Sequence, residues 1–181
     1  MLFGTEIFEL KILDAISAAF SCRVMDYIMP KLTVLGNGGV LWILIAVFML
    51  AVKKYRGTGI KLAAALIGCL IAVNIVLKPL VARPRPCWLN ESVLLLIKTP
   101  HDYSFPSGHA AASFASACVL LTYNKKAGIA ALILACLIAF SRMYLYVHFP
   151  TDVAAGALIG CLAAAVMPRL AACIRERVSH S

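Results

Sequence analysis

The sequence predicts an all-α membrane protein, a polytopic helical bundle that forms one domain over residues 1–181. Of the 181 residues, 62% are hydrophobic and 14% are charged, and the mean hydropathy is +0.92. Soluble domains are only about half apolar. The charged residues also stand at the ends of long uncharged stretches, which is the pattern of helices that cross a bilayer. We therefore expect five transmembrane helices, preceded by an amphipathic or short first helix within residues 1–30.

The N-terminal segment predicts an amphipathic helix over residues 5–20. Its polar side chains fall near one face, and the apolar ones lie largely opposite; the polar set is Glu6, Glu9, Asp14 and Ser17. Such a helix is expected to lie in the membrane interface, where its acidic residues would face water. A short spanning helix that continues to Met29 is the alternative.

Five uncharged stretches follow. The first has 21 residues between Lys31 and Lys53 and begins with Gly36-Asn37-Gly38-Gly39, which predicts a turn or helix entry. The other four hold 15 or 16 uncharged residues each, in residues 62–77, 110–124, 127–141 and 153–168. At about 1.5 Å per residue these are short for a core of about 30 Å. Each becomes long enough if a polar end residue extends the helix, which places Lys78, His109, Arg142 and Asp152 at helix ends.

Two polar loops, residues 78–106 and 141–152, emerge on the same side of the predicted bundle. The opposite side carries nine basic residues: Lys53, Lys54, Arg56, Lys61, Lys125, Lys126, Arg169, Arg175 and Arg177. The loop side carries five, which are Lys78, Arg83, Arg85, Lys98 and Arg142, plus three on the N-terminal segment. The positive-inside rule predicts a multi-pass protein of the plasma membrane whose two loops face the extracytoplasmic side.

The net charge of +9 does not indicate a nucleic-acid partner, because the cations are spread between apolar runs and form no single patch. The seven cysteines show no Cys-x-x-Cys spacing, so zinc and redox sites are not predicted. Several lie in apolar stretches, where cysteine behaves as a small hydrophobe. Gly156 and Gly160 have the spacing that permits close contact between helices.

Three short polar motifs carry the chemistry. In the first, Lys78 and Arg85 lie on a segment stiffened by proline, Lys-Pro-Leu-Val-Ala-Arg-Pro-Arg-Pro. Lys78 alone is explained by snorkelling at the interface, but guanidinium groups of fixed direction match phosphate oxygens.

The second motif is Pro106-Ser107-Gly108-His109, directly before an apolar run. A helix start offers free N–H groups and a positive dipole end to an anion, and a histidine there can transfer a proton near neutral pH. A plain helix cap is the structural alternative.

The third motif is Ser141-Arg142-x5-His148-x3-Asp152. Four-residue spacing brings His148 and Asp152 together around one helical turn. A carboxylate on one ring nitrogen leaves the other free as a nucleophile or base. A structural hydrogen bond at the membrane edge is the alternative.

Together the motifs bring cations, a helix start and two histidines to one face of the membrane, which is what metal-free phosphoryl transfer through a covalent intermediate needs. His109, His148 and Asp152 could instead bind a metal. Lys78, Arg85 and Arg142 disfavour this reading, since three positive charges repel a divalent cation and attract an oxyanion. No metal and no cofactor are predicted.

In order and spacing, the three motifs resemble the signatures of the type 2 phosphatidic acid phosphatase superfamily over Lys78 to Asp152. The resemblance implies a six-helix core and a metal-independent mechanism. It also implies that His148 attacks phosphorus to form a phosphohistidine, that Asp152 orients it and that His109 protonates the leaving oxygen. The implied phosphate-binding residues are Lys78, Arg85, Ser107, Gly108 and Arg142. Arg83 lies outside the motif and is predicted to be close enough to touch a second phosphate.

Membrane members of that family act on lipid phosphates and diphosphates. A small chain with an outward site is similar to undecaprenyl-diphosphate phosphatases, with phosphatidylglycerophosphate or phosphatidic acid as the alternative substrate. The partners implied are the lipid substrate and the bilayer, while the oligomeric state stays open. A different class, a transporter or scaffold that binds an anion without turnover, would need no nucleophile.

Overall fold

The computed structural model describes residues 4–179, and every regular element within them is a helix. The elements are α1 (Glu6–Phe20), α2 (Arg23–Gly36), η1 (Asn37–Gly39), α3 (Val40–Ala51), α4 (Arg56–Cys69), η2 (Leu70–Leu77), α5 (Lys78–Val81), α6 (Pro86–Leu89), α7 (Gly108–Tyr123), α8 (Lys125–Tyr144) and α9 (Pro150–Ser179). The all-α prediction is confirmed. The side chains of Arg175 and Arg177, two of the nine basic residues on the side opposite the loops, lie outside the described part.

Helix α7 is the centre of the bundle and packs against α4, α8 and α9. Its contact with α9 is close because two glycines of α9 face it. A Cβ atom built on Gly160 would lie 2.3 Å from the carbonyl oxygen of Ala111, and one on Gly156 would lie 2.4 Å from that of Ser107. The contact predicted from the glycine spacing is therefore present, and it joins α9 to the first turn of α7.

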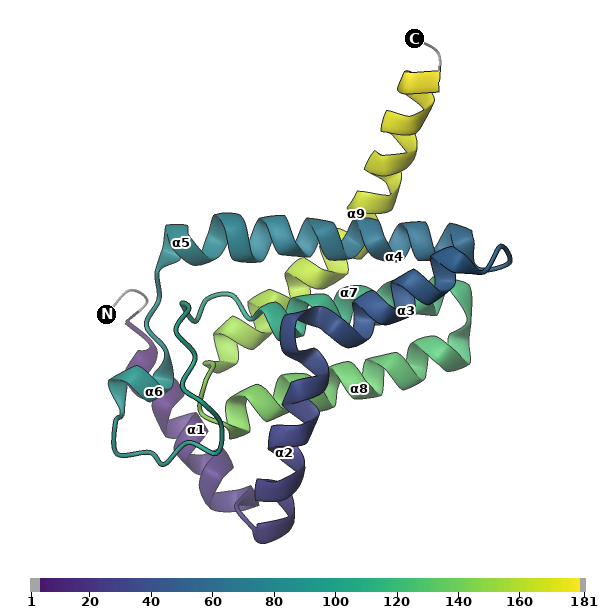
Figure 1. Cartoon of the computed structure of the whole chain (residues 1–181). Helices are drawn as coiled ribbons and strands as arrows, with labels where there is room; N and C mark the ends of the chain where they lie inside the picture. The colour runs from purple at the N-terminus through teal and green to yellow at the C-terminus, as the bar shows by residue number, and fades with distance from the viewer. Residues whose placement is uncertain (1–3, 180–181) are drawn as a thin grey trace.

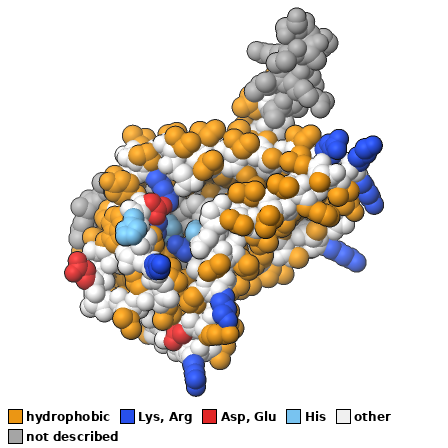
Figure 2. All heavy atoms as spheres, viewed as in Figure 1, with side chains coloured by type: hydrophobic (Ala, Val, Ile, Leu, Met, Phe, Trp, Pro, Cys, Tyr) orange, Lys and Arg blue, Asp and Glu red, His pale blue; other side chains and the backbone are white. Residues whose placement is uncertain are grey.

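Four helical segments are long and apolar enough to cross a membrane: Arg23–Ala51, Arg56–Leu89, Lys125–Tyr144 and Pro150–Leu170. Figure 2 shows apolar side chains along the helices, with Lys and Arg gathered at one end of the molecule and, toward the other, around a group of His and acidic side chains. The predicted count of five spans is not confirmed. Helix α7 has 16 residues, about 24 Å of helix, and is enclosed by its neighbours.

One long helical rod runs from α4 through the π-helical η2 into α5, along the upper edge of the bundle in Figure 1. It ends at Ala82, which has a left-handed backbone with φ 48°. Lys78 therefore lies in the last turns of the rod, at the helix end predicted for it. π-helical turns are frequent at functional sites, and Asn74 of this stretch lines the cavity described below.

The predicted turn after Gly36 is confirmed: Gly38 and Gly39 have φ values of 57° and 68°. Glycine adopts this left-handed region without the steric cost of a Cβ atom. The chain changes direction here, so the 21-residue uncharged stretch forms the end of α2 and the separate 12-residue α3.

The boundaries predicted for the first helix are close to those of α1, but its orientation is not the one expected. Glu6 and Glu9 are buried, whereas Ile7 and Phe8 are 57% and 67% exposed. In the first turn of α1 the acidic side chains therefore point into the protein and the two apolar ones point out, while further along Leu13 is buried and Asp14 is exposed. The physical reason is a buried partner: Glu9 forms an ion pair with Arg83, which has no exposed surface.

Candidate active site

The first turn of α7 is bound directly to the first turn of α9. Ser107 is the N-cap of α7, and its Oγ accepts a 3.5 Å hydrogen bond from the backbone N–H of Ala110. The backbone N–H of Ser107 donates to the carbonyl oxygen of Asp152 over 3.0 Å. Gly156 packs beneath this junction. The second and third sequence motifs are thereby held at a fixed separation.

The segment between α8 and α9 folds back on the end of α8. The backbone N–H groups of Val147 and His148 donate to the carbonyl oxygen of Arg142, over 3.2 and 3.3 Å. Asp152 Oδ2 accepts from the N–H of Phe149 over 2.8 Å and lies 3.5 Å from His148 Nδ1. The predicted approach of His148 and Asp152 is present.

Arg85 is the most highly connected cation of the site. Its Nε and Nη2 donate to the carbonyl and carboxylate oxygens of Asp102, each over 2.7 Å. Its Nη1 donates to the carbonyl of Val147 over 2.7 Å and lies 3.2 Å from His148 Nε2. The other oxygen of Asp102 pairs with Lys78 Nζ. One carboxylate thus bridges the two cations of the first motif.

These contacts fix the tautomer of the His148 ring. A guanidinium has only donors, so Nε2 must accept from Arg85 and carries the lone pair. The proton then lies on Nδ1, within 3.5 Å of Asp152 Oδ2 and 3.4 Å of Ser104 Oγ. Ser104 also donates to that carboxylate oxygen. The resulting order of carboxylate, Nδ1–H and bare Nε2 suits a nucleophilic imidazole.

His148 is held in its neutral form. Burial lowers the pKa of its ring well below 6.5, and the positive charges of Arg85, Arg142 and Lys78 act in the same direction. Burial alone would raise the pKa of the Asp102 carboxyl, but Lys78 and Arg85 hold that pKa well below its usual range. Around neutral pH the site therefore combines an uncharged base with a carboxylate between two cations.

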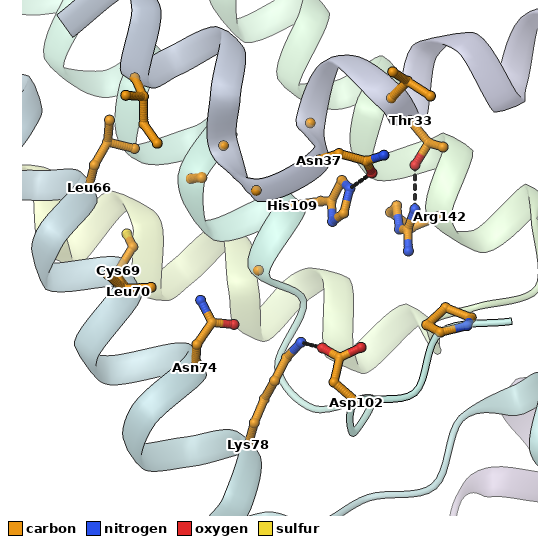
Figure 3. Close-up of a pocket in the computed structure, with 18 of the residues that line it drawn as sticks. Thr33, Asn37, Leu66, Cys69, Leu70, Asn74, Lys78, Asp102, His109 and Arg142 are labelled. Atoms are coloured by element: carbon orange, nitrogen blue, oxygen red, sulfur yellow. Dashed lines mark hydrogen bonds and ion pairs between the residues drawn. The ribbon is translucent and has the colours of Figure 1, made fainter. Parts of the chain in front are cut away.

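His109 is positioned by the N-terminal half of the chain. Its Nε2 lies 3.0 Å from Asn37 Oδ1, and its ring packs on Gly36, where an added Cβ atom would lie 2.6 Å from His109 Cδ2. Arg142 Nη1 similarly donates to Thr33 Oγ1. Figure 3 shows His109 and Arg142 both turned toward α2 and the turn that follows it.

A cavity of about 950 Å³ joins these groups. Six predicted site residues line its polar part: Lys78, Arg85, Gly108, His109, Arg142 and His148. Beyond them it continues as an apolar groove between α3 and the α4 rod, lined by Ile43, Ala46, Val47, Leu50, Leu66 and Leu70 among others. In Figure 3, Lys78 and Asp102 lie at the polar part, while Leu66 lies further along the rod.

Two predicted site residues, Ser107 and Asp152, do not form part of the cavity wall. Both have no exposed surface. Asp152 lies behind His148, with Oδ2 3.5 Å from the ring Nδ1. The Ser107 side chain caps α7 and is not presented to the cavity, unlike the expectation that it holds phosphate.

Arg83 is placed differently from its prediction. It has no exposed surface, and it pairs with Glu9 and Asp152. A second phosphate in the cavity could not reach a guanidinium enclosed in this way, so that prediction is wrong. Arg83 instead lies behind His148, where it is bound to Asp152 and Glu9.

Sequence reasoning missed several polar residues around the site: Glu9, Thr33, Asn37, Asp102 and Ser104. Asp102 and Ser104 had a usable signal, since they lie five and three residues before the Ser107-Gly108-His109 helix start. Glu9, Thr33 and Asn37 had none, because their contacts depend on how α1, α2 and η1 fold back onto α7, α8 and α9. Within the described residues, no group of three or more His, Cys, Asp or Glu side chains could hold a metal ion.

Known proteins resemble this chain in sequence and in fold. The family profile described as the PAP2 superfamily matches residues 58–174. A protein named undecaprenyl-diphosphatase from Sulfolobus acidocaldarius is 38% identical over 120 residues, which is 66% of this chain and 58% of that protein. The chain thus aligns with less than two thirds of that relative's length.

Two solved structures have the same fold. The crystal structure of Aquifex aeolicus LpxE superposes with a TM-score of 0.78 and 32% identity, covering 88% of this chain and 94% of that one. The transmembrane PAP2-type phosphatidylglycerolphosphate phosphatase of Bacillus subtilis gives a TM-score of 0.74 and 25% identity, covering 95% and 88%.

Proposed function

The chain belongs to the PAP2 superfamily, and from this premise we propose that it is an integral membrane phosphatase that hydrolyses a lipid phosphate or diphosphate without a metal. The carrying observation is the shape and lining of one cavity. Its polar part holds two histidines, Asp102 and four cations, which are Lys78, Arg85, Lys98 and Arg142, and its remainder is an apolar groove. This combination suits a ligand with an anionic head and a hydrocarbon chain.

In the proposed first step, Lys78, Arg85, Arg142 and the backbone N–H at Gly108 hold the phosphate oxygens. His148 Nε2 attacks phosphorus, the P–O bond to the leaving group breaks, and His109 donates a proton to that oxygen. The product is a phosphohistidine whose Nδ1–H is stabilised by Asp152. Arg85 supports this step because it touches both the phosphate site and the attacking nitrogen.

In the second step, water attacks the phosphohistidine while His109 takes its proton. The N–P bond breaks, inorganic phosphate is released and neutral His148 is regenerated. His109 suits both proton transfers because it shares the cavity with His148 and its ring is fixed by Asn37 and Gly36.

Undecaprenyl diphosphate is the substrate we favour, because the Sulfolobus relative carries that activity in its name. Phosphatidylglycerophosphate is the second candidate, named for the Bacillus structure, and phosphatidic acid is the third. The excess of basic residues on the opposite side supports an active site at the extracytoplasmic face of the plasma membrane.

The test is phosphate release by purified protein in a chelator, with the three lipids compared at equal concentration. We expect turnover to be highest with undecaprenyl diphosphate and to be abolished in His148→Ala. Turnover that survives this change would contradict the covalent mechanism. Binding of the lipids without any release of phosphate would favour the transporter or scaffold alternative.

A further inference from the structure

A buried chain of charged groups connects α1 to the nucleophile. Glu9 is 3% exposed. One of its oxygens accepts from the backbone N–H and the Oγ1 of Thr151, over 3.0 and 2.6 Å. The other pairs with Arg83 Nη2 and accepts from Thr5 Oγ1 over 3.2 Å. Both oxygens of this carboxylate are thus bound by the protein.

Arg83 carries the contact onward to Asp152. Its Nη1 donates to Asp152 Oδ1 over 2.6 Å and to Thr151 Oγ1 over 2.8 Å. The guanidinium also stacks 4.0 Å above the centre of the Phe149 ring. Because Oδ1 of Asp152 is bound to Arg83, Oδ2 is directed to Ser104, to the Phe149 N–H and to His148.

The order of charges in this chain matters for the reaction. Arg83 paired with Asp152 alone would cancel the negative charge that stabilises a cationic His148. Glu9 supplies a second negative charge to the same guanidinium, so the three groups together keep one negative charge beside the histidine. Removing one partner from a buried ion pair also leaves the other uncompensated and free to change its contacts.

We propose that Glu9 is a positioning residue of the active site, acting through Arg83 and Thr151 on the Asp152–His148 pair. This inference rests on the proposed function. It adds to that function because residues 1–57 lie outside the family match. Helix α1 accordingly contributes to the active site by positioning Asp152 and His148.

A second contact from α1 reaches the same loop. Tyr146 has a left-handed backbone with φ 59°, which is unusual for a residue with a Cβ atom. Its hydroxyl donates to Asp14 over 2.8 Å. Tyr146 precedes His148 by two residues, so α1 contacts the chain on both sides of the nucleophile.

The experiment uses the full chain in lipid nanodiscs and compares Glu9→Gln with Lys11→Gln, an exposed charge on the same helix. Glu9→Gln should lower kcat about 100-fold, the scale of a misplaced reacting group. KM should change less than twofold, because Glu9 is absent from the cavity lining. Lys11→Gln should leave both unchanged. An unchanged kcat in Glu9→Gln, or a rise in KM that accounts for the whole loss, overturns the proposal.

Thr151 provides a second pair of variants should Glu9→Gln not fold. Thr151→Val removes the hydroxyl that contacts Glu9 and Arg83, whereas Thr151→Ser keeps it. We expect kcat to fall in the first and to be retained in the second. Equal kcat values in the two variants overturn the proposal.

The ring ¹⁵N resonances of His148 make the test independent of turnover. If the wild type releases phosphate from none of the lipids, the proposed function fails. A shift of these resonances in Glu9→Gln but not in Lys11→Gln would in that case still support positioning of His148 by Glu9. If the wild type is active and the resonances and kcat of Glu9→Gln match it, the positioning role fails and the phosphatase remains.

Discussion

Nη1 of Arg85 lies 3.2 Å from Nε2 of His148. The guanidinium expected to bind phosphate therefore points at the lone pair expected to attack phosphorus. A phosphate oxygen drawn to Arg85 arrives beside that lone pair, so binding and alignment are achieved by the same side chain.

Arg85→Lys should be severely impaired for this reason. Lysine cannot place donors on Asp102, Val147 and His148 at once, because its charge is on a single nitrogen. We expect kcat/KM to fall about 100- to 1,000-fold, the scale of losing a fixed donor to the transition state. Steady-state kinetics with the favoured lipid measure it. Lys126→Gln, an exposed cation at the start of α8, is the control, and a loss below tenfold would contradict the prediction.

The pH dependence of kcat/KM should show its acidic limb below pH 6.5. This limb reports the essential base of the free enzyme, and burial and three cations lower the pKa of His148 below that value. A lowered pKa keeps the ring neutral as the pH falls, and activity declines only when the pH passes through the depressed pKa. His101→Gln, on an exposed loop position, should not move the limb. A limb at or above 6.5 would refute this.

Asp102→Asn should bind inorganic phosphate more tightly. The Asp102 carboxylate forms ion pairs with Lys78 and Arg85, and it therefore competes with phosphate for these two cations. The pKa of Asp102 is lowered, so the carboxylate stays charged until the pH is below the usual range of a carboxyl. Acidification to about pH 5 therefore does not relieve this competition. We expect the inhibition constant of phosphate to fall about fivefold, the scale of one exposed ion pair. A weaker affinity would show that Asp102 mainly holds the two cations in place.

Gly156→Ala should destabilise the protein and lower its activity. Its new Cβ atom would meet the carbonyl oxygen of Ser107 at 2.4 Å, so α9 must move away from the first turn of α7. Overpacking of this kind costs about 1–3 kcal/mol. Gly57→Ala is the control, since an added Cβ atom there meets nothing within 4 Å. Thermal unfolding midpoints in nanodiscs compare the two, and equal midpoints would contradict the prediction.

The cavity-lining site residues could be found from the sequence because each lies in a motif whose spacing is set by local structure. His148 lies two residues before α9, so the four-residue step to Asp152 brings the pair together across the start of that helix, and Gly108 follows the cap of α7. The glycine pair of α9 likewise gave the helix contact. Such relationships depend on neighbours in the chain and do not require the whole fold.

What could not be predicted depends on contacts between distant segments. Arg83 was assigned to the substrate because its partner, Glu9, is 74 residues away. The orientation of α1 could not be predicted because it also depends on the Glu9–Arg83 pair. Amphipathic spacing defines two faces of a helix but does not say which of them faces the protein. The predicted span count differed because α7 is enclosed by other helices and needs less length than a helix that faces lipid.

The outward orientation of Ile7 and Phe8 makes the position of Glu9 depend on what surrounds the start of α1. In water, Ile7 and Phe8 would favour turning inward, and that rotation would withdraw the Glu9 carboxylate from Arg83. When hydrocarbon surrounds the helix, Ile7 and Phe8 no longer favour turning inward. Lipid therefore helps to keep Glu9 in contact with Arg83, which in turn holds Asp152 beside His148. Removal of lipid should accordingly abolish the proposed phosphatase activity while the central helices are still folded.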